Sequence, residues 1–197
     1  MAPRRTKSVH APVEPAPRWE RVAFWLACGG AVGLFLFVVA VRHAEPLGLD
    51  QGLFACFGRF MLEGWVPYRD IWDHKPPGLP LFFTAAFAVF GPETGSLWKL
   101  EALWLAASAG LAFGLGARLR DRWAGLVAAV TLIGVLWAPM WGGYWARAQA
   151  EELIVLPLLG SGWACWRSQR ALADGGTGAG PAFLAGLLTG CAAVFKL

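Results

Sequence analysis

The densest group of reactive side chains lies in the stretch YRDIWDHKPPG, which runs from Tyr68 to Gly78. It places two cations, two carboxylates and one imidazole within seven positions, and two prolines then stiffen the backbone. A lysine ammonium is a compact cation with three hydrogen-bond donors, which suits it to hold a phosphate. The sequence therefore predicts a functional cluster at Asp73, His74 and Lys75, in which Lys75 is suited to hold a lipid phosphate.

Carboxylates gather at two further places. Asp50 precedes the run LFACFGRFML, whose apolar spacing predicts an amphipathic helix that lies flat on a membrane and stops at Gly64. Glu151 and Glu152 open a later apolar block. A carboxylate this close to a bilayer is a candidate functional group. Two structural interpretations stay open: Asp50 as a helix N-cap, and the two glutamates as partners of a helix dipole.

The composition is typical of a membrane protein. Hydrophobic residues make up 57% of the 197 residues and charged residues 15%, with a mean hydropathy of +0.50. A soluble domain carries about 25% charged residues. The apolar residues form long uncharged blocks, and about 20 such residues cross a hydrocarbon core of about 30 Å. We therefore predict an all-α, polytopic helical membrane protein with about five transmembrane helices, at about 22–41, 98–117, 123–142, 150–166 and 181–197.

The basic residues predict which loops lie inside. The 13 uncharged residues from Gly78 to Phe90 are too few for a typical span. If they do not cross, the loops on one side of the membrane carry ten Lys and Arg residues and four acidic residues. The loops on the other side carry six Lys and Arg residues and nine acidic residues. The positive-inside rule then places the N-terminus in the cytoplasm. The stretch YRDIWDHKPPG would lie on the opposite, periplasmic or extracellular, face of a plasma (inner) membrane.

This topology divides the chain into two parts. Residues 1–20, rich in proline and charge, form a disordered cytoplasmic arm, and residues 21–197 form the transmembrane domain. External loop 42–97 contains interfacial helices at about 50–63 and 78–90, and a second external loop covers about 143–152. Because three charged groups then share one surface, we expect Asp50 to converge with the segment 73–75, with Glu151 or Glu152 facing them across a cavity.

A structural interpretation stays open for part of the charged stretch. Charged residues and tryptophans that precede a membrane segment are ordinary interfacial anchors. That interpretation applies to Arg69, Asp70 and Trp72.

The order of these features resembles the N-terminal portion of bacterial membrane glycosyltransferases of the GT-C superfamily. The resemblance rests on an anchor, Asp50 at the start of an amphipathic helix, GWVPYRDIWDHKPPGLPLFF with Phe90-Gly91, and GYWARAQAEELIVLPLL. It is to the branch with protein O-mannosyltransferases and the enzyme that adds aminoarabinose to lipid A, and it covers the chain from about residue 20. Such enzymes are much longer, so we expect an N-terminal fragment that is inactive alone. Gln51 departs from the family, which usually has a glutamate after the aspartate.

The resemblance implies a reaction. A sugar would be transferred from a polyprenyl-phosphate donor, whose tail lies in the membrane lipid, to an acceptor hydroxyl of a glycan, lipid or protein, with inversion at C1. Asp50 would be the catalytic general base. No cofactor or metal is implied. The implied substrate-binding residues are Tyr68, Arg69, Asp73, His74, Lys75, Glu151 and Glu152.

Other patterns are uninformative or argue against further functions. The four cysteines are solitary, which predicts neither a zinc site nor a disulfide framework. The run DGGTGAG lacks the lysine of a phosphate loop and a preceding strand, and we expect no nucleic-acid partner. A membrane transporter or a non-catalytic scaffold is the alternative function. A transporter should carry charges near mid-membrane, whereas the predicted spans are almost free of them.

The topology can be tested by cysteine labelling in a variant without native cysteines. We expect Gly91→Cys to react with a membrane-impermeant reagent added outside the cell, and Arg120→Cys to react only after permeabilisation. The reason is the asymmetric distribution of basic residues. Labelling of both positions from the same side would contradict the model.

Overall fold

The computed structural model describes residues 17–43, 46–137 and 148–196, and these residues are helical apart from their connections. One isolated bridge pairs Pro67 with Ile71. The prediction of an all-α fold is confirmed for this part of the chain. Residues 1–16 of the predicted N-terminal arm lie outside the described residues. The helices are α1 (Arg18–His43), α2 (Leu49–Leu62), α3 (Gly78–Phe90), α4 (Thr94–Leu119), α5 (Arg122–Trp137), α7 (Ala150–Leu153), α8 (Val155–Ala173) and α9 (Ala179–Ala193).

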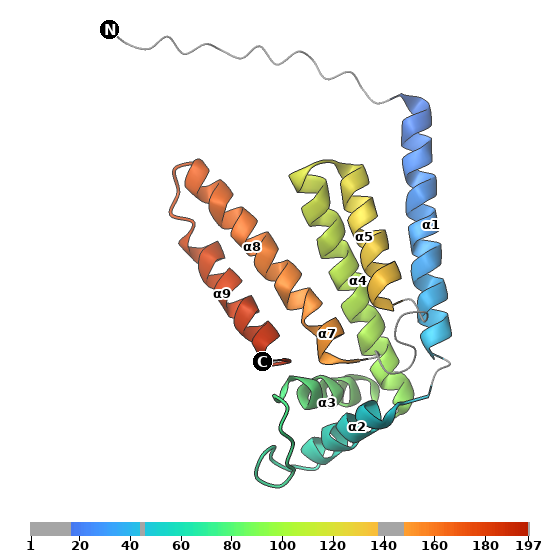
Figure 1. The fold of residues 1–197 in the computed structure, drawn as a ribbon, viewed down its shortest axis with the longest axis vertical. Coiled ribbons are helices and arrows are strands. Elements are labelled where there is room, and N and C mark those ends of the chain that lie inside the picture. Colours follow the sequence, from blue (N-terminus) through green and yellow to red (C-terminus); the bar gives the residue numbers. More distant parts are fainter. Residues whose placement is uncertain (1–16, 44–45, 138–147, 197) are drawn as a thin grey trace.

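The long helices run up and down beside one another, and two shorter helices lie across their lower ends (Figure 1). Helix α4 packs against α1, α5 and α8, and α8 packs against α9. Helices α2 and α3 pack together, and α3 also contacts α4. The segment 78–90 therefore lies crosswise to the long helices, as expected for a segment that does not span with them.

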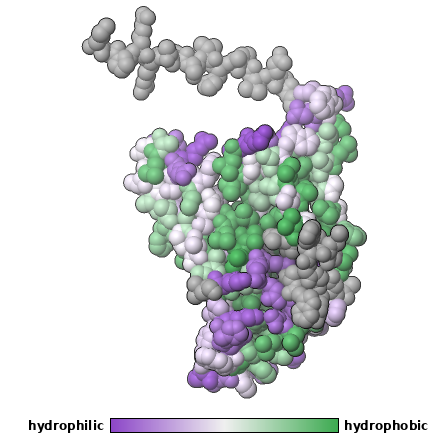
Figure 2. Space-filling view, in the orientation of Figure 1, coloured by the Kyte–Doolittle hydropathy of each residue, from purple (hydrophilic) through white to green (hydrophobic). Residues whose placement is uncertain are grey.

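Two helices, α1 and α4, are long and apolar enough to cross a membrane by length and composition. Shorter apolar helices are Gly78–Phe90, Arg122–Val135 and Ala179–Ala193. Figure 2 shows hydrophobic residues across the middle of the bundle, with hydrophilic residues at its upper end and in its lower part. The five predicted spans fall on α1, α4, α5, α8 and α9, but their crossing of a membrane stays a prediction. Part of the third span, 138–142, lies outside the described residues.

The helices at the predicted span of about 150–166 have other bounds than the span, whose crossing of a membrane stays a prediction. The helix is interrupted at Ile154, which separates α7 from α8, and α8 continues to Ala173. Pro157 explains the interruption because it has no N–H to donate to the carbonyl of Leu153. That carbonyl instead accepts the indole N–H of Trp104 in α4, at 3.1 Å. The long helix at this place therefore begins at Val155, and Glu151 and Glu152 lie outside it.

Helices α2 and α3 lie close to the predicted bounds 50–63 and 78–90, and their place at a membrane interface stays a prediction. Helix α2 ends before Gly64, and α3 ends at Gly91; both glycines have φ +93°. A left-handed glycine of this kind commonly follows the end of a helix. Proline at positions 76 and 77 precedes the first residue of α3. Turn chemistry at the ends therefore accounts for both helices.

The α2–α3 contact depends on Gly58. A Cβ atom at this position would lie 2.9 Å from the backbone nitrogen of Thr84 and 2.9 Å from the Cβ of Phe83. The absence of a side chain lets the two helices approach closely enough to bury Phe54 and Phe83, whose ring centroids are 6.1 Å apart. The buried cluster to which they belong contains Phe54, Ala55, Leu79, Phe82, Phe83, Ala86, Phe87, Leu97, Trp98, Ala148, Ala150 and Leu153.

A second buried cluster holds the long helices together. It joins α1, α4 and α5 and consists of Val38, Leu105, Ala109, Ala129 and Ile133. The core is thus divided between the bundle itself and the layer of α2 and α3 across its lower end.

The close packing at Gly58 predicts that a glycine-to-alanine substitution changes the free energy of unfolding in opposite directions at Gly58 and at Gly52, both on α2. Gly58→Ala should lower the free energy of unfolding by about 1–3 kcal/mol because the methyl group clashes with α3. Gly52→Ala should raise it by about 0.5–1 kcal/mol, since a Cβ at Gly52 meets no atom within 4 Å and alanine favours a helix. Thermal unfolding in detergent measures both. Equal effects at the two positions would contradict the α2–α3 contact.

Candidate functional site

Asp50 and Lys75 form an ion pair at the lower end of the bundle. The Lys75 ammonium lies 3.2 Å from Oδ2 of Asp50, and the two side chains are 33% and 46% exposed. Asp50 lies in the first turn of α2, whose N-cap is Gly48, so the interpretation of Asp50 as the cap is wrong. The expected convergence of Asp50 with the segment 73–75 is confirmed.

Three further contacts fix the position of Lys75. Its ammonium lies 5.0 Å from the centre of the Phe54 ring, a cation–π contact. Its backbone N–H donates to Oδ1 of Asp73 at 3.1 Å, and its carbonyl accepts the Tyr68 hydroxyl at 2.8 Å. The ammonium therefore approaches Asp50 from a backbone that is already held in place.

The loop from Trp65 to Asp73 is a folded turn. Tyr68 has φ +64°, unusual for a residue with a side chain, and its N–H donates to the carbonyl of Ile71 at 2.7 Å. Asp70 accepts the Val66 N–H at 2.8 Å and two N–H groups of Arg69. The Arg69 guanidinium, together with the Val66 N–H, lowers the pKa of Asp70 to about 2. Arg69 and Asp70 thus close the turn.

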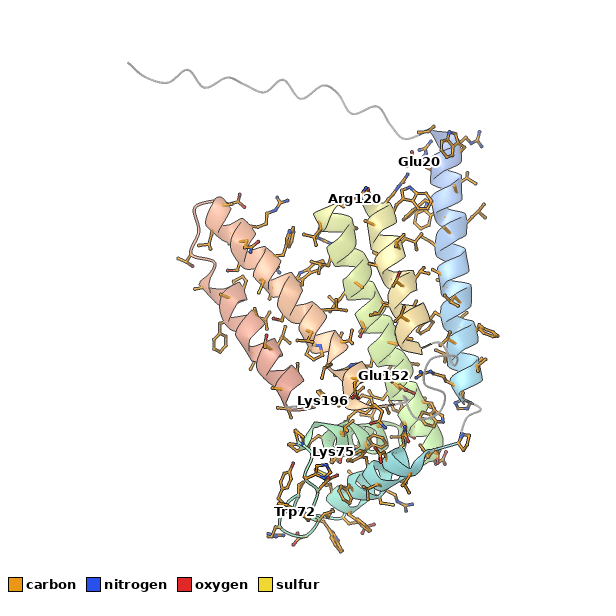
Figure 3. All side chains as sticks on the ribbon, in the orientation of Figure 1. Glu20, Trp72, Lys75, Arg120, Glu152 and Lys196 are labelled. Carbon is orange, nitrogen blue, oxygen red and sulfur yellow. The ribbon has the colours of Figure 1, made fainter. Side chains whose placement is uncertain are left out.

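The side chains of His74 and Trp72 both lie on the outer side of this loop. His74 is 85% exposed at the side chain, and its Nδ1 lies 3.1 Å from Oδ1 of Asp73. Trp72 is 76% exposed and lies at the edge of the molecule farthest from the long helices (Figure 3). That place does not favour Trp72 as an anchor at the level of the apolar bundle.

The two neighbouring glutamates have different environments. Glu152 is 6% exposed and turns into the interior, where its Oε1 lies 3.1 Å from Nη1 of Arg42. Glu151 is exposed and forms an ion pair with Lys196. The prediction that either glutamate could face the Asp50–Lys75 pair is therefore wrong for Glu152 and remains a prediction for Glu151.

Glu152 belongs to a buried charge network that sequence reasoning missed. Arg42, from α1, also contacts Oε1 of Glu101, from α4, at 3.3 Å. The N–H of Ala148 donates to both carboxylates, at 3.0 and 3.1 Å, from a backbone with φ +46°. The available signal was a charge at one end of each of three apolar blocks, namely Arg42, Glu101 and Glu152.

Lys196 is a second cation near Lys75 that the sequence prediction did not assign to the site. Hydrogen bonding to Lys196 and, more weakly, the charge of Lys75 lower the pKa of Glu151. The end of the chain reaches this place because the Gly78 N–H donates to the carbonyl of Val194 at 2.9 Å. A Cβ on Gly78 would lie 2.5 Å from that oxygen. The sequence prediction had the chain end inside the span 181–197, so it contained no signal that Lys196 reaches this place.

The pocket beside Lys75 is small. It has a cavity volume of about 10 Å³, room for about one water molecule. A substrate would therefore bind over the exposed faces of Asp50 and Lys75 or after the loop moves. The pocket is lined by Phe57, Met61, Pro67, Tyr68, Ile71, Asp73, Lys75, Pro77 and Pro80.

Within the described residues, no three His, Cys, Asp or Glu side chains are grouped as metal ligands. The four cysteines are free thiols. Comparisons with protein-family models, with curated proteins and with solved structures found no match to this chain.

The contrast between the two glutamates predicts different effects of the same substitution. Glu152→Gln should lower the free energy of unfolding by about 1.5–3 kcal/mol, the range for losing a hydrogen bond to a buried charged group. Glu151→Gln should change it by less than about 1 kcal/mol because its ion pair is exposed. Thermal or chemical unfolding measures both. A larger loss for Glu151→Gln would contradict the assignment of Glu152 to the buried network.

Proposed function

We propose that this chain forms part of a membrane glycosyltransferase that takes its sugar from a polyprenyl-phosphate donor. The observation that carries the proposal is the Asp50–Lys75 pair, in which a carboxylate and an ammonium from separate segments meet at 3.2 Å. The pair is partly exposed at one end of an apolar helical bundle. A base and a phosphate-binding cation at a membrane surface are what this reaction requires.

The membrane insertion is part of the proposal. Helices α1 and α4 support it by length and composition, and α5, α8 and α9 run beside them. The donor's tail would lie in the lipid and its phosphate at the surface, where Lys75 neutralises it. The pair would face the periplasm or the outside, since the opposite end of the bundle carries most of the arginines.

The ion pair also suggests an order of events. In the absence of donor, Lys75 holds the Asp50 carboxylate. A donor phosphate that binds Lys75 would compete for the ammonium and free Asp50. Asp50 then accepts the proton of the acceptor hydroxyl while the hydroxyl oxygen attacks C1 of the sugar. The bond between C1 and the phosphate oxygen breaks, and polyprenyl phosphate leaves. Neutralisation of the departing phosphate stabilises charge that develops in the transition state.

Neighbouring groups would assist at the same surface. Lys196 provides a second ammonium, and Glu151 holds it in place. His74 is exposed and can contact the donor or the acceptor, while Arg69 and Tyr68 maintain the loop that carries Lys75. Gln51, the residue that departs from the family pattern, is 1% exposed and so lies apart from the exposed side of Asp50.

The positions of the charges do not favour a transporter. In the described residues of α1, α4, α5, α8 and α9, the charged side chains lie near the helix ends, apart from Glu101, which lies in the third turn of α4 and pairs with Arg42 from the end of α1. Transporters typically carry charged groups or broken helices near mid-membrane. Surface chemistry therefore fits the arrangement better.

Two substitutions test the proposed roles in the natural protein. Asp50→Asn should reduce turnover by about 10²-fold or more and leave donor binding largely intact, because asparagine cannot accept the proton. Lys75→Ala should weaken donor binding as well, because the phosphate is present in both ground and transition states. The measurement is transfer of sugar from a radiolabelled polyprenyl-phosphate donor in proteoliposomes.

Arg59→Gln is the control, since Arg59 lies on α2 but is not part of the proposed site. It should transfer sugar at the rate of the unsubstituted protein. Near-normal turnover of Asp50→Asn would exclude Asp50 as the base and make Glu151 the next candidate.

A further inference from the structure

We propose that the end of the bundle opposite the Asp50–Lys75 pair carries a binding site for the phosphate of an anionic phospholipid. Arg118 of α4 and Arg170 of α8 form the site over the indole rings of Trp163 and Trp166. The inference rests on the proposed insertion of the chain in a membrane and is independent of glycosyl transfer.

Two guanidinium groups gather on one aromatic surface. The Cζ of Arg118 lies 4.3 Å from the centre of the Trp163 ring and 5.9 Å from that of Trp166. The Cζ of Arg170 lies 5.3 Å from the centre of the Trp166 ring. Both arginines are exposed, and among the ion pairs between described residues neither has a carboxylate partner. Two guanidinium groups that both contact the Trp166 ring, and that have no carboxylate partner among these ion pairs, can attract an anion.

The local packing prepares this surface. Trp163 lies against Gly114 of α4, where a Cβ atom would be 2.8 Å from Cζ3 of the indole, so the ring fits closely only beside a glycine. Arg118 donates from Nη1 to the carbonyl of Gly114 at 3.2 Å. This bond orients the guanidinium across the ring and leaves its other N–H groups for a ligand. Phosphate matches such a planar donor group in a bidentate manner.

The surroundings favour a phospholipid over a free phosphate. Tryptophan is enriched at the level of lipid headgroups, where an acyl chain can contact the ring while arginine holds the phosphate. Figures 1 and 3 show that the ends of α4 and α8 lie at the end of the bundle that holds Glu20 and Arg120. Charged residues at this end also include Arg18, Arg21, Arg122, Arg167, Asp121 and Asp174.

Native mass spectrometry in neutral detergent can test the site. The purified chain is titrated with phosphatidylglycerol and, separately, with phosphatidylcholine. The double variant Arg118→Gln/Arg170→Gln should bind phosphatidylglycerol about 30-fold more weakly, the equivalent of about 1 kcal/mol for each arginine near an anionic surface. The unsubstituted chain should bind phosphatidylcholine more weakly than phosphatidylglycerol. The double variant should bind phosphatidylcholine with nearly the same affinity as the unsubstituted chain.

Matched variants separate this site from general charge effects. Arg59→Gln removes one arginine charge, as Arg170→Gln does, but at the opposite end of the molecule. This variant should bind phosphatidylglycerol with the affinity of the unsubstituted chain. Asp50→Asn should also bind it normally, so a failed transfer assay and a failed lipid assay are distinguishable. If the double variant does not fold, Arg170→Gln alone should show about a fivefold loss, because Arg170 contributes one of the two charges.

Three results would overturn the proposal. The first is binding of phosphatidylglycerol to the folded double variant, or to Arg170→Gln where only that variant folds, with the affinity of the unsubstituted chain. The second is an equal loss in Arg59→Gln. The third is displacement of phosphatidylglycerol by millimolar inorganic phosphate, which would assign the surface to the free anion.

Discussion

The contact of Arg42 with two buried carboxylates is the constraint on which the lower half of the molecule depends. It joins the end of α1 to α4 through Glu101 and to α7 through Glu152, and Ala148 donates its N–H to both carboxylates. Buried charges are costly unless each is paired and hydrogen-bonded, so the network tolerates few alternative arrangements of these three elements. It therefore determines where α1 ends, and hence where α2 can begin.

The short helix α7 transmits this constraint to the surface. Successive residues on a helix point about 100° apart, so Glu152 can enter the interior while Glu151 stays exposed and pairs with Lys196. Pro157 and the Trp104–Leu153 hydrogen bond interrupt the helix directly after these residues. The backbone keeps helical angles at Ile154, so α7 and α8 stay connected and the position of Glu152 in the buried network is tied to the packing of α8 in the bundle. One short helix thus links the core to the candidate site.

Local signals predicted more of this structure than long-range ones. Two prolines before α3 and a glycine after it determine its ends, so 78–90 could be predicted from the sequence. The common face of Asp50 and Lys75 followed from counting basic residues, and their pairing is confirmed. Contacts between residues 59 and 110 positions apart join Arg42 to its carboxylates, and no local pattern indicates them. Which of Glu151 and Glu152 is buried likewise depends on the rotation of α7 against α4, which no local pattern indicates.

The acidic side chains discussed above differ in their exposure: Glu101 and Glu152 are buried beside Arg42, whereas Asp50 is partly exposed beside Lys75. Glu101 and Glu152 are shielded from water, and both contact the guanidinium of Arg42, so removing either would break a buried hydrogen bond. Asp50 and Lys75 remain partly exposed, and a pair of that kind contributes only about 0–1 kcal/mol to stability. In the proposed function, a donor phosphate would therefore replace Asp50 as the partner of Lys75 at little cost to the fold. The buried network would keep the helices in place during that proposed exchange, because the Asp50–Lys75 pair is not part of what holds the bundle together.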